Sequence, residues 1–95
     1  MLELVLTLVS EEISEACMLD GQALHGRVQV VEHFADFRVK IVDHFPDLKV
    51  LAVDHFPNAC GKWTFVEHFP DFTITFVDSF PDFTIAYVDS FPGVD

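Results

Sequence analysis

The chain has 95 residues, enough for one small domain, and its 16 acidic residues against 5 lysines and arginines give a net charge of -11 at pH 7. This charge disfavours binding to nucleic acid phosphates and to anionic membranes. Hydrophobic residues make up 51% of the chain and include eleven phenylalanines, which is too many for a disordered acidic chain. We therefore expect a folded monomer that binds neither nucleic acid nor membranes. Its partner is unknown.

Residues 1–16, MLELVLTLVSEEISEA, differ in character from the remainder of the chain. A short apolar run is followed by the small-x-small sequence Ser14-Glu15-Ala16 just before Cys17, as in a secretion leader. No basic region precedes the run, and acids crowd the cleavage position. Two interpretations stay open for residues 1–16, a flexible segment or the remnant of a leader, with export outside the cytoplasm following from the second. No apolar run reaches the ~18 residues that a membrane-spanning helix needs.

From about residue 28 onward one phrase recurs six times: valine, an acid, histidine or serine, then phenylalanine. The third position of the phrase is occupied in turn by His33, His44, His55, His68, Ser79 and Ser90, at spacings of 11, 11, 13, 11 and 11 residues. The two extra residues fall in the sequence PNACGKW, which also contains Cys60. The period predicts a repeat domain over residues 17–95.

Each repeat contains the signals of one strand and one turn. Apolar and polar residues alternate, for example in FTITF at 72–76, which is typical of a half-buried strand. Proline at five of the six phrases excludes a long helix. The sequence Phe-Pro-Asp predicts a turn in which aspartates such as Asp47, Asp71 and Asp82 accept a local backbone N–H. The invariant valine and phenylalanine columns are expected inside, and Trp63 is expected in a core layer.

The repeat length limits how the strands can pair. Eleven residues hold a strand and a corner, whereas a parallel crossover ordinarily needs about a dozen residues for the connection alone. Consecutive strands are therefore not expected to be parallel neighbours. They either form hairpins or alternate between two facing sheets, so that each repeat pairs with the next but one. The identical corners favour the second arrangement, an all-β domain wound in two layers.

The sequence resembles a known family in the stretches ACMLDGQALHGRVQVVEHF, VDHFPDLKV, VDSFPDFTI, NACGKW and YVDSFPG. These are similar to the bacterial septoil-knot domains, over about residues 16 to 95. The resemblance implies a small all-β domain tied as a seven-crossing torus knot, which the pattern of strands alone would not suggest because natural chains rarely thread. It implies export for many members, and it brings no established activity, cofactor or catalytic residue.

Histidine and carboxylate side chains stand next to each other in four repeats, and both are good metal ligands. His33, His44, His55 and His68 are therefore candidate ligands for zinc. The same position holds serine in the last two repeats, which favours a small polar group at a corner over a metal ligand. The main expectation is that the domain has no metal site.

The repeated acids offer a second candidate cation site, for calcium. They are Glu32, Asp43, Asp54, Glu67, Asp78 and Asp89, together with the aspartates of the turns. With only four glycines the chain lacks the glycine-rich corners of calcium-binding β-rolls. The other interpretation is that these acids cap corners and keep a β-rich surface soluble. The sequence thus favours a stable structural or binding module without enzymatic activity, and a cation-binding protein is the alternative.

The two cysteines, Cys17 and Cys60, belong to no CxxC pair. With a histidine as base, a free cysteine is chemically able to serve as a nucleophile. Cys60 stands beside Gly61 in the inserted corner, which is a natural place for a covalent link to the N-terminal part. We predict a Cys17–Cys60 disulfide, with two free thiols as the alternative.

Overall fold

The computed structural model describes residues 13–94, and in this range it contains eight strands and no helix. Most of the predicted N-terminal segment 1–16 lies outside the described residues. No helix within 13–94 is long and apolar enough to cross a membrane. The strands are β1 (Met18–Leu19), β2 (Gln22–Ala23), β3 (Gly26–Val30), β4 (Phe37–Ile41), β5 (Leu48–Ala52), β6 (Lys62–Phe65), β7 (Phe72–Phe76) and β8 (Phe83–Tyr87). The all-β prediction is confirmed.

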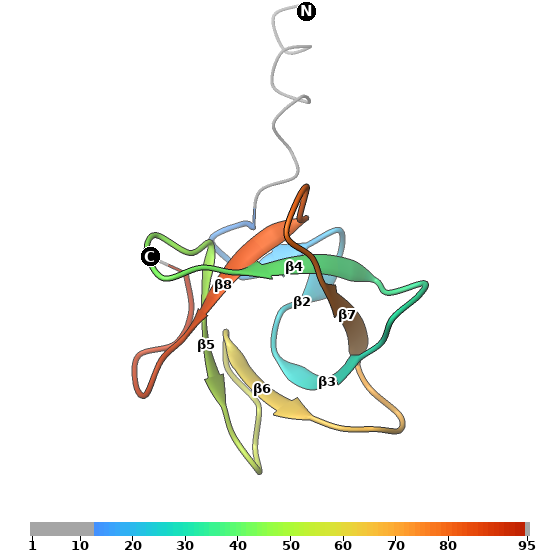
Figure 1. The fold of residues 1–95 in the computed structure, drawn as a ribbon. Coiled ribbons are helices and arrows are strands. Elements are labelled where there is room, and N and C mark those ends of the chain that lie inside the picture. Colours follow the sequence, from blue (N-terminus) through green and yellow to red (C-terminus); the bar gives the residue numbers. More distant parts are fainter. Residues whose placement is uncertain (1–12, 95) are drawn as a thin grey trace, which may run out of the picture.

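Strands β3 to β8 form one closed barrel of parallel strands, in the order β3-β6-β5-β8-β4-β7 (Figure 1). The first three repeats, β3, β4 and β5, occupy alternate places around the barrel. The last three, β6, β7 and β8, fill the places between them. The chain therefore winds around the barrel in two interleaved laps, and the second lap begins at the corner between β5 and β6.

This barrel corrects the expected pairing. The prediction of two facing sheets, with each repeat paired to the next but one, is wrong, because most strands pair with strands three or four repeats away. The prediction that consecutive strands are never parallel neighbours is also wrong, because β5 and β6 pair in parallel.

The register explains why such short corners suffice. Val30 ends β3 and pairs with Ile74, and Ile74 pairs with Phe37, the first residue of β4. Each strand is thus shifted by two residues against its neighbour, so the start of β4 is level with the end of β3. The corner spans two strand spacings, roughly 10 Å, and need not run back along the barrel as an ordinary crossover does. Between β5 and β6 the chain moves by only one strand position around the barrel. Ala52, the last residue of β5, therefore pairs with Trp63, so this corner has to run back along the barrel by two residues before β6 continues.

The core is built from two buried positions in each repeat, which are the first and third residue of every barrel strand except β6, where they are Gly61, just before the strand, and Trp63, its second residue. Ten of these twelve positions carry large apolar side chains, and Gly26 and Gly61 take the other two. The buried large residues of the barrel are Val28, Phe37, Val39, Leu48, Val50, Trp63, Phe72, Ile74, Phe83 and Ile85. Their aromatic rings meet edge to face, as Trp63 and Phe72 do with ring centroids 5.6 Å apart. Trp63 fills the same layer as Val28 and Ile74, as predicted.

The expectation that the valine and phenylalanine columns both lie inside is wrong. The six phenylalanines of the phrase are exposed: Phe34, Phe45, Phe56, Phe69, Phe80 and Phe91. The valines are half-buried, and each donates its backbone N–H to a neighbouring strand, for example Val77 to the Val39 carbonyl at 2.9 Å. The valine therefore ends the strand ladder, and the phenylalanine after it lies beyond the barrel wall.

The turn aspartates fasten corners to distant strands and not to their own turns, which corrects the predicted local bonds. Asp47 and Thr84 are paired reciprocally, because each backbone N–H donates to the other's side-chain oxygen at 2.9 Å. Asp36 and Thr73 form the same pair. Asp71 and Asp82 accept the backbone N–H groups of Arg27 and Arg38. We call these four aspartates the latch aspartates.

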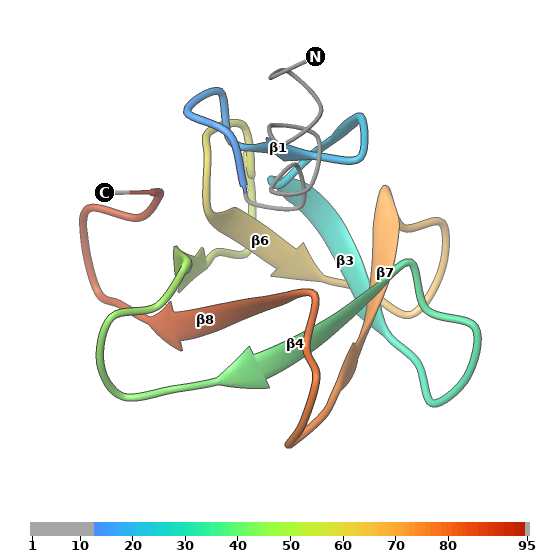
Figure 2. The same cartoon turned by 90° about the horizontal axis from the view of Figure 1, so that it is seen from above.

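The N-terminal hairpin of β1 and β2 closes one end of the barrel, and it stands behind the barrel in Figure 1 and at its upper edge in Figure 2. Its Leu19 and the following Leu24 are buried in the core. Cys17 forms a disulfide with Cys60, with Cα atoms 5.8 Å apart, so this prediction is confirmed. In the chain-entropy model a link across 43 residues stabilises the fold by about 4 kcal/mol. The hairpin is thereby bound covalently to the corner where the second lap begins.

Candidate functional site

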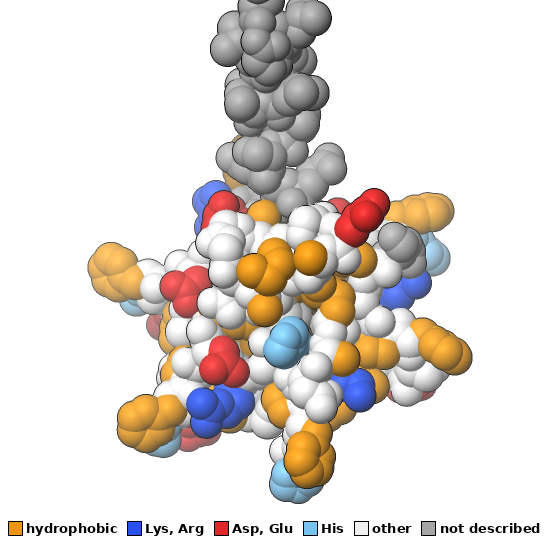
Figure 3. Space-filling model, turned by 180° about the vertical axis from the view of Figure 1, so that it is seen from behind, with side chains coloured by type: hydrophobic (Ala, Val, Ile, Leu, Met, Phe, Trp, Pro, Cys, Tyr) orange, Lys and Arg blue, Asp and Glu red, His pale blue; other side chains and the backbone are white. Residues whose placement is uncertain are grey.

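Six corners project outward from the barrel, and each ends in an acid, a histidine or serine, and a phenylalanine. We call these triplets the corner tips; they are residues 32–34, 43–45, 54–56, 67–69, 78–80 and 89–91. Every residue of the six tips is exposed. In Figure 3 groups of hydrophobic side chains stand out at separate places on the outline, and a further group lies near the middle of this face. The projecting groups are thus separated from one another around the rim of the barrel.

The tip phenylalanines are unusual in both exposure and backbone conformation. Their side chains are 80 to 101% exposed, and all six have a positive φ between 53 and 60°. A left-handed conformation is costly for a bulky residue and is normally given to glycine, asparagine or aspartate. Exposed phenylalanine gains nothing from burial either. Neither packing nor local backbone preference explains a phenylalanine at this place in all six corners.

The predicted ligands His33, His44, His55 and His68 lie on four different corner tips. Each ring stands beside the phenylalanine that follows it, with centroids 6.3 to 6.4 Å apart at a tilted angle. The tip geometry is thus repeated closely from corner to corner. Within residues 13–94 no three His, Cys, Asp or Glu side chains gather as a metal would require.

Ten acids of the repeats fall into two sets with different surroundings. The latch aspartates are engaged by backbone N–H groups, as described above. The tip acids, at the first position of each corner tip, are exposed, and each stands two residues before an exposed phenylalanine. All five lysines and arginines lie within strands β3 to β6, so no tip carries a cation. The rim of the molecule is therefore acidic and aromatic, and its positive charges lie on the barrel wall.

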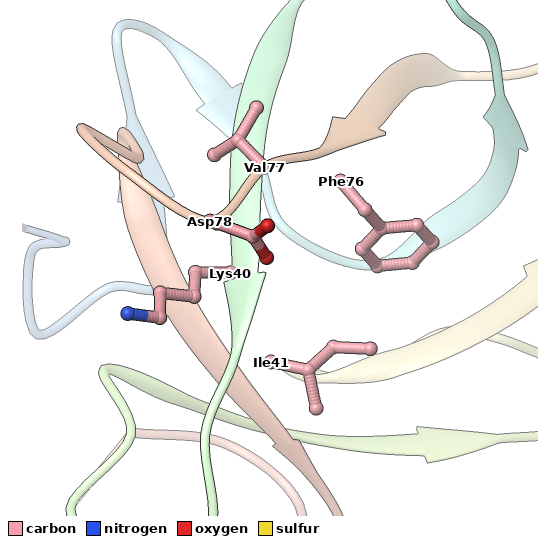
Figure 4. Close-up of a pocket in the computed structure, with 5 residues that line it drawn as sticks. All are labelled: Lys40, Ile41, Phe76, Val77 and Asp78. Atoms are coloured by element: carbon pink, nitrogen blue, oxygen red, sulfur yellow. The ribbon is translucent and has the colours of Figure 1, made fainter.

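A second apolar surface lies at the barrel end opposite the hairpin, where the last residue of each strand reaches solvent. Its large side chains are Val30, Ile41, Phe65, Phe76 and Tyr87, each 40 to 49% exposed. A shallow depression of about 200 Å³ opens there, lined by Lys40, Ile41, Phe76, Val77 and Asp78. In Figure 4 the Phe76 ring lies beside Ile41, and the Lys40 ammonium points away from both. We call this end the barrel mouth.

Burial raises the pKa of Tyr87, a residue of the barrel mouth, above its ordinary value of 10.0. Its neighbours in the ring of last strand residues are apolar, and they stabilise the neutral phenol over the phenolate. The mouth residues are thus partly packed on the core, unlike the tip phenylalanines.

The sequence pointed to the histidines and acids of the tips but not to the exposure of their phenylalanines. A signal was present, because each of these phenylalanines stands at a turn, and turns run over the surface. The hydrophobic character of phenylalanine and its invariance within the chain favoured the core instead.

Comparison with known proteins identifies one family and no curated relative. The family model described as the 7(1) septoil knot domain matches residues 21–95. No curated protein matches the chain at the threshold applied. The matched residues include all six barrel strands, all six corner tips and Cys60.

Proposed function

We propose that this chain, which belongs to the 7(1) septoil knot domain family, is a rigid binding module, not an enzyme, whose contact residues are the six corner tips. The observation that carries this proposal is the set of six phenylalanines that are both fully exposed and held at positive φ. Conformations that cost stability persist where the surrounding structure enforces them, and they cluster at functional sites. A barrel closed on itself, with a disulfide at one end, is a suitable frame for holding such tips.

The fold itself should not need the tip side chains, and one repeat offers a matched pair of variants. Phe80 is exposed at a tip, and Phe83 is buried three residues later. We expect Phe80→Asn to leave the free energy of unfolding unchanged or to raise it by about 1 kcal/mol, because asparagine accepts a left-handed backbone. Phe83→Asn should lose about 3 kcal/mol or more, since it removes core packing and buries an amide. Urea unfolding measures both. A loss above about 1 kcal/mol for Phe80→Asn would assign the tips to folding and contradict the proposal.

Contact through the tips can be tested by photo-crosslinking in the cells that make the protein. Benzoylphenylalanine is placed at Phe80 or Phe45 and, as a control, at Ala86 on the barrel wall. We expect a discrete cross-linked species from the tip positions and none from Ala86. Equal cross-linking from all three positions, or none from any, would show that the tips are not a contact surface.

We propose further that the chain carries the seven-crossing torus knot that the family description names. The two interleaved laps support this, because every second-lap strand lies between two first-lap strands. A fully extended free chain has a contour length of roughly 3.5 Å per residue. When the disulfide is reduced and the two ends are pulled apart in a single-molecule experiment, a knotted chain should reach a shorter contour length than this. A full contour length would show that the chain is not knotted.

A further inference from the structure

We propose that the corner tips bind an arginine-rich protein segment, each tip receiving one guanidinium group between its phenylalanine ring and its carboxylate. This inference rests on the proposed binding function and specifies the partner of the same site.

The chemistry of a single tip selects the cation. Each tip presents an exposed ring and, two residues earlier, an exposed carboxylate, and it contains no lysine or arginine. Arginine combines the two complementary properties, because its planar guanidinium stacks on aromatic faces and pairs with carboxylates through two N–H groups. Lysine pairs with the carboxylate as a point charge and stacks less well. The tips should therefore prefer arginine to lysine.

The number of tips sets the form of the partner. One exposed ion pair or cation–π contact contributes little to affinity, so a single tip binds weakly on its own. Six tips on one rigid barrel raise the effective concentration for each further contact, provided that the partner carries several arginines on one flexible segment. The distribution of charge supports the same partner, because every tip carries an acid and the lysines and arginines are in the strands of the barrel wall.

Other occupants fit the rim less well. A nucleic acid or an anionic surface would meet the tip acids with like charge. A neutral apolar pocket would accept the rings but would desolvate the neighbouring carboxylates without pairing them. An exposed acid two residues before an exposed ring, repeated six times, is best matched by a cationic planar group.

The test uses the disulfide-bonded protein and two synthetic Gly/Ser peptides of equal length and spacing, one with about six arginines and the other with the same number of lysines. Fluorescence anisotropy at several salt concentrations measures binding. We expect the arginine peptide to bind about tenfold more tightly than the lysine peptide, with an affinity that falls as salt rises. Equal affinity for the two peptides would overturn the proposal in favour of charge attraction alone.

Matched variants separate the tips from the overall charge. Asp78→Asn with Asp89→Asn removes two tip acids, and Glu15→Gln with Asp20→Asn removes two exposed acids elsewhere for the same change in net charge. The first pair should weaken binding several-fold more than the second. Replacing three tip phenylalanines, Phe45, Phe69 and Phe80, by asparagine should weaken it about tenfold without a change of charge.

Unchanged affinity in the phenylalanine variant would overturn the inference. Other results would contradict the proposed binding function itself. They are a loss of stability in the tip variants, or the absence of any partner cross-linked at the tips. A protein whose tips cross-link a partner but do not bind the arginine peptide would keep its binding function and lose only the partner assigned here.

Discussion

At the scale of single residues, the six corners use phenylalanine where the backbone asks for glycine or asparagine. Glycine does stand at Gly26 and Gly61, where a side chain would collide with its surroundings. Gly61 has a φ of +83°, and a Cβ atom there would meet the Lys49 carbonyl oxygen and the Gly93 nitrogen. At this point the corner that begins the second lap and the C-terminal end of the chain pass each other closely.

Gly61→Ala should destabilise the fold by about 3 kcal/mol, through backbone strain and through this collision. Gly21 provides the control, because its φ of +81° is nearly the same but nothing lies within 4 Å of the added Cβ. Gly21→Ala should cost only the strain, about 1 kcal/mol. Urea unfolding gives both values, and equal losses would show that the close approach at Gly61 does not matter.

Tyr87 is the one tyrosine of the chain, so its titration can be followed by phenolate absorbance. Since burial raises its pKa, the folded state holds the phenol proton more tightly than the unfolded state does. The resulting stability is fully present below the pKa of unfolded tyrosine and is lost as the pH rises through the pKa of the folded protein. The folded protein should titrate at higher pH than the same protein in urea. Identical midpoints would contradict the burial of Tyr87 at the barrel mouth.

At the scale of strands and corners, the latch aspartates act at the same place in four repeats, just before a barrel strand. The two other corners are fastened differently at this place. Cys60 is fastened by the disulfide, and Gly93 by two backbone hydrogen bonds to Lys49 at 2.9 Å. Fastening between segments far apart in the chain is therefore a general property of these corners. The ion pairs of Arg27 with Asp71 and Arg38 with Asp82, at 3.9 and 3.7 Å and half-exposed, add little.

One corner contains an internal control for this role. Asp47 is a latch aspartate, and Asp43 is the exposed acid at the tip of the same corner. Asp47→Ala should lower the free energy of unfolding by about 1 kcal/mol, because the Thr84 N–H loses its carboxylate acceptor, whereas the bond from the backbone N–H of residue 47 to the Thr84 hydroxyl is kept. Asp43→Ala, with the same change of charge, should stay within about 0.5 kcal/mol of the parent. Equal effects would mean that charge, and not the hydrogen bonds, is responsible.

The sequence was most informative about local structure. Alternation at 72–76 predicted a half-buried strand, and the structure contains it as β7, with Phe72 and Ile74 buried. Two features depended on long-range geometry that no local pattern encodes. The stagger of two residues per strand, which removes the need for long crossovers, arises from closure of the barrel. The tip phenylalanines are exposed because each strand ends at the valine. The phenylalanine three residues later therefore lies beyond the barrel wall.

At the scale of the whole molecule, the net charge is -11, and six of the 16 acids lie at the exposed corner tips. Like charges on such a surface repel diffusely, so screening by salt should raise the melting temperature. NaCl and CaCl2 at equal ionic strength should raise it equally. An additional, saturable rise with Ca²⁺ or Zn²⁺, with stoichiometric binding by calorimetry, would contradict this and favour the alternative of a cation-binding protein.

The corner between β5 and β6 is the single place where the chain steps to an adjacent position instead of passing over one. This step divides the repeats into two equal groups of three, and it limits how such a protein can grow or shrink. Duplicating one repeat would leave an unpaired strand in one lap, whereas adding one repeat on each side of PNACGKW would give a wider barrel of eight strands. Gene duplication and protein design should therefore both find lengths of this architecture that change by two repeats at a time.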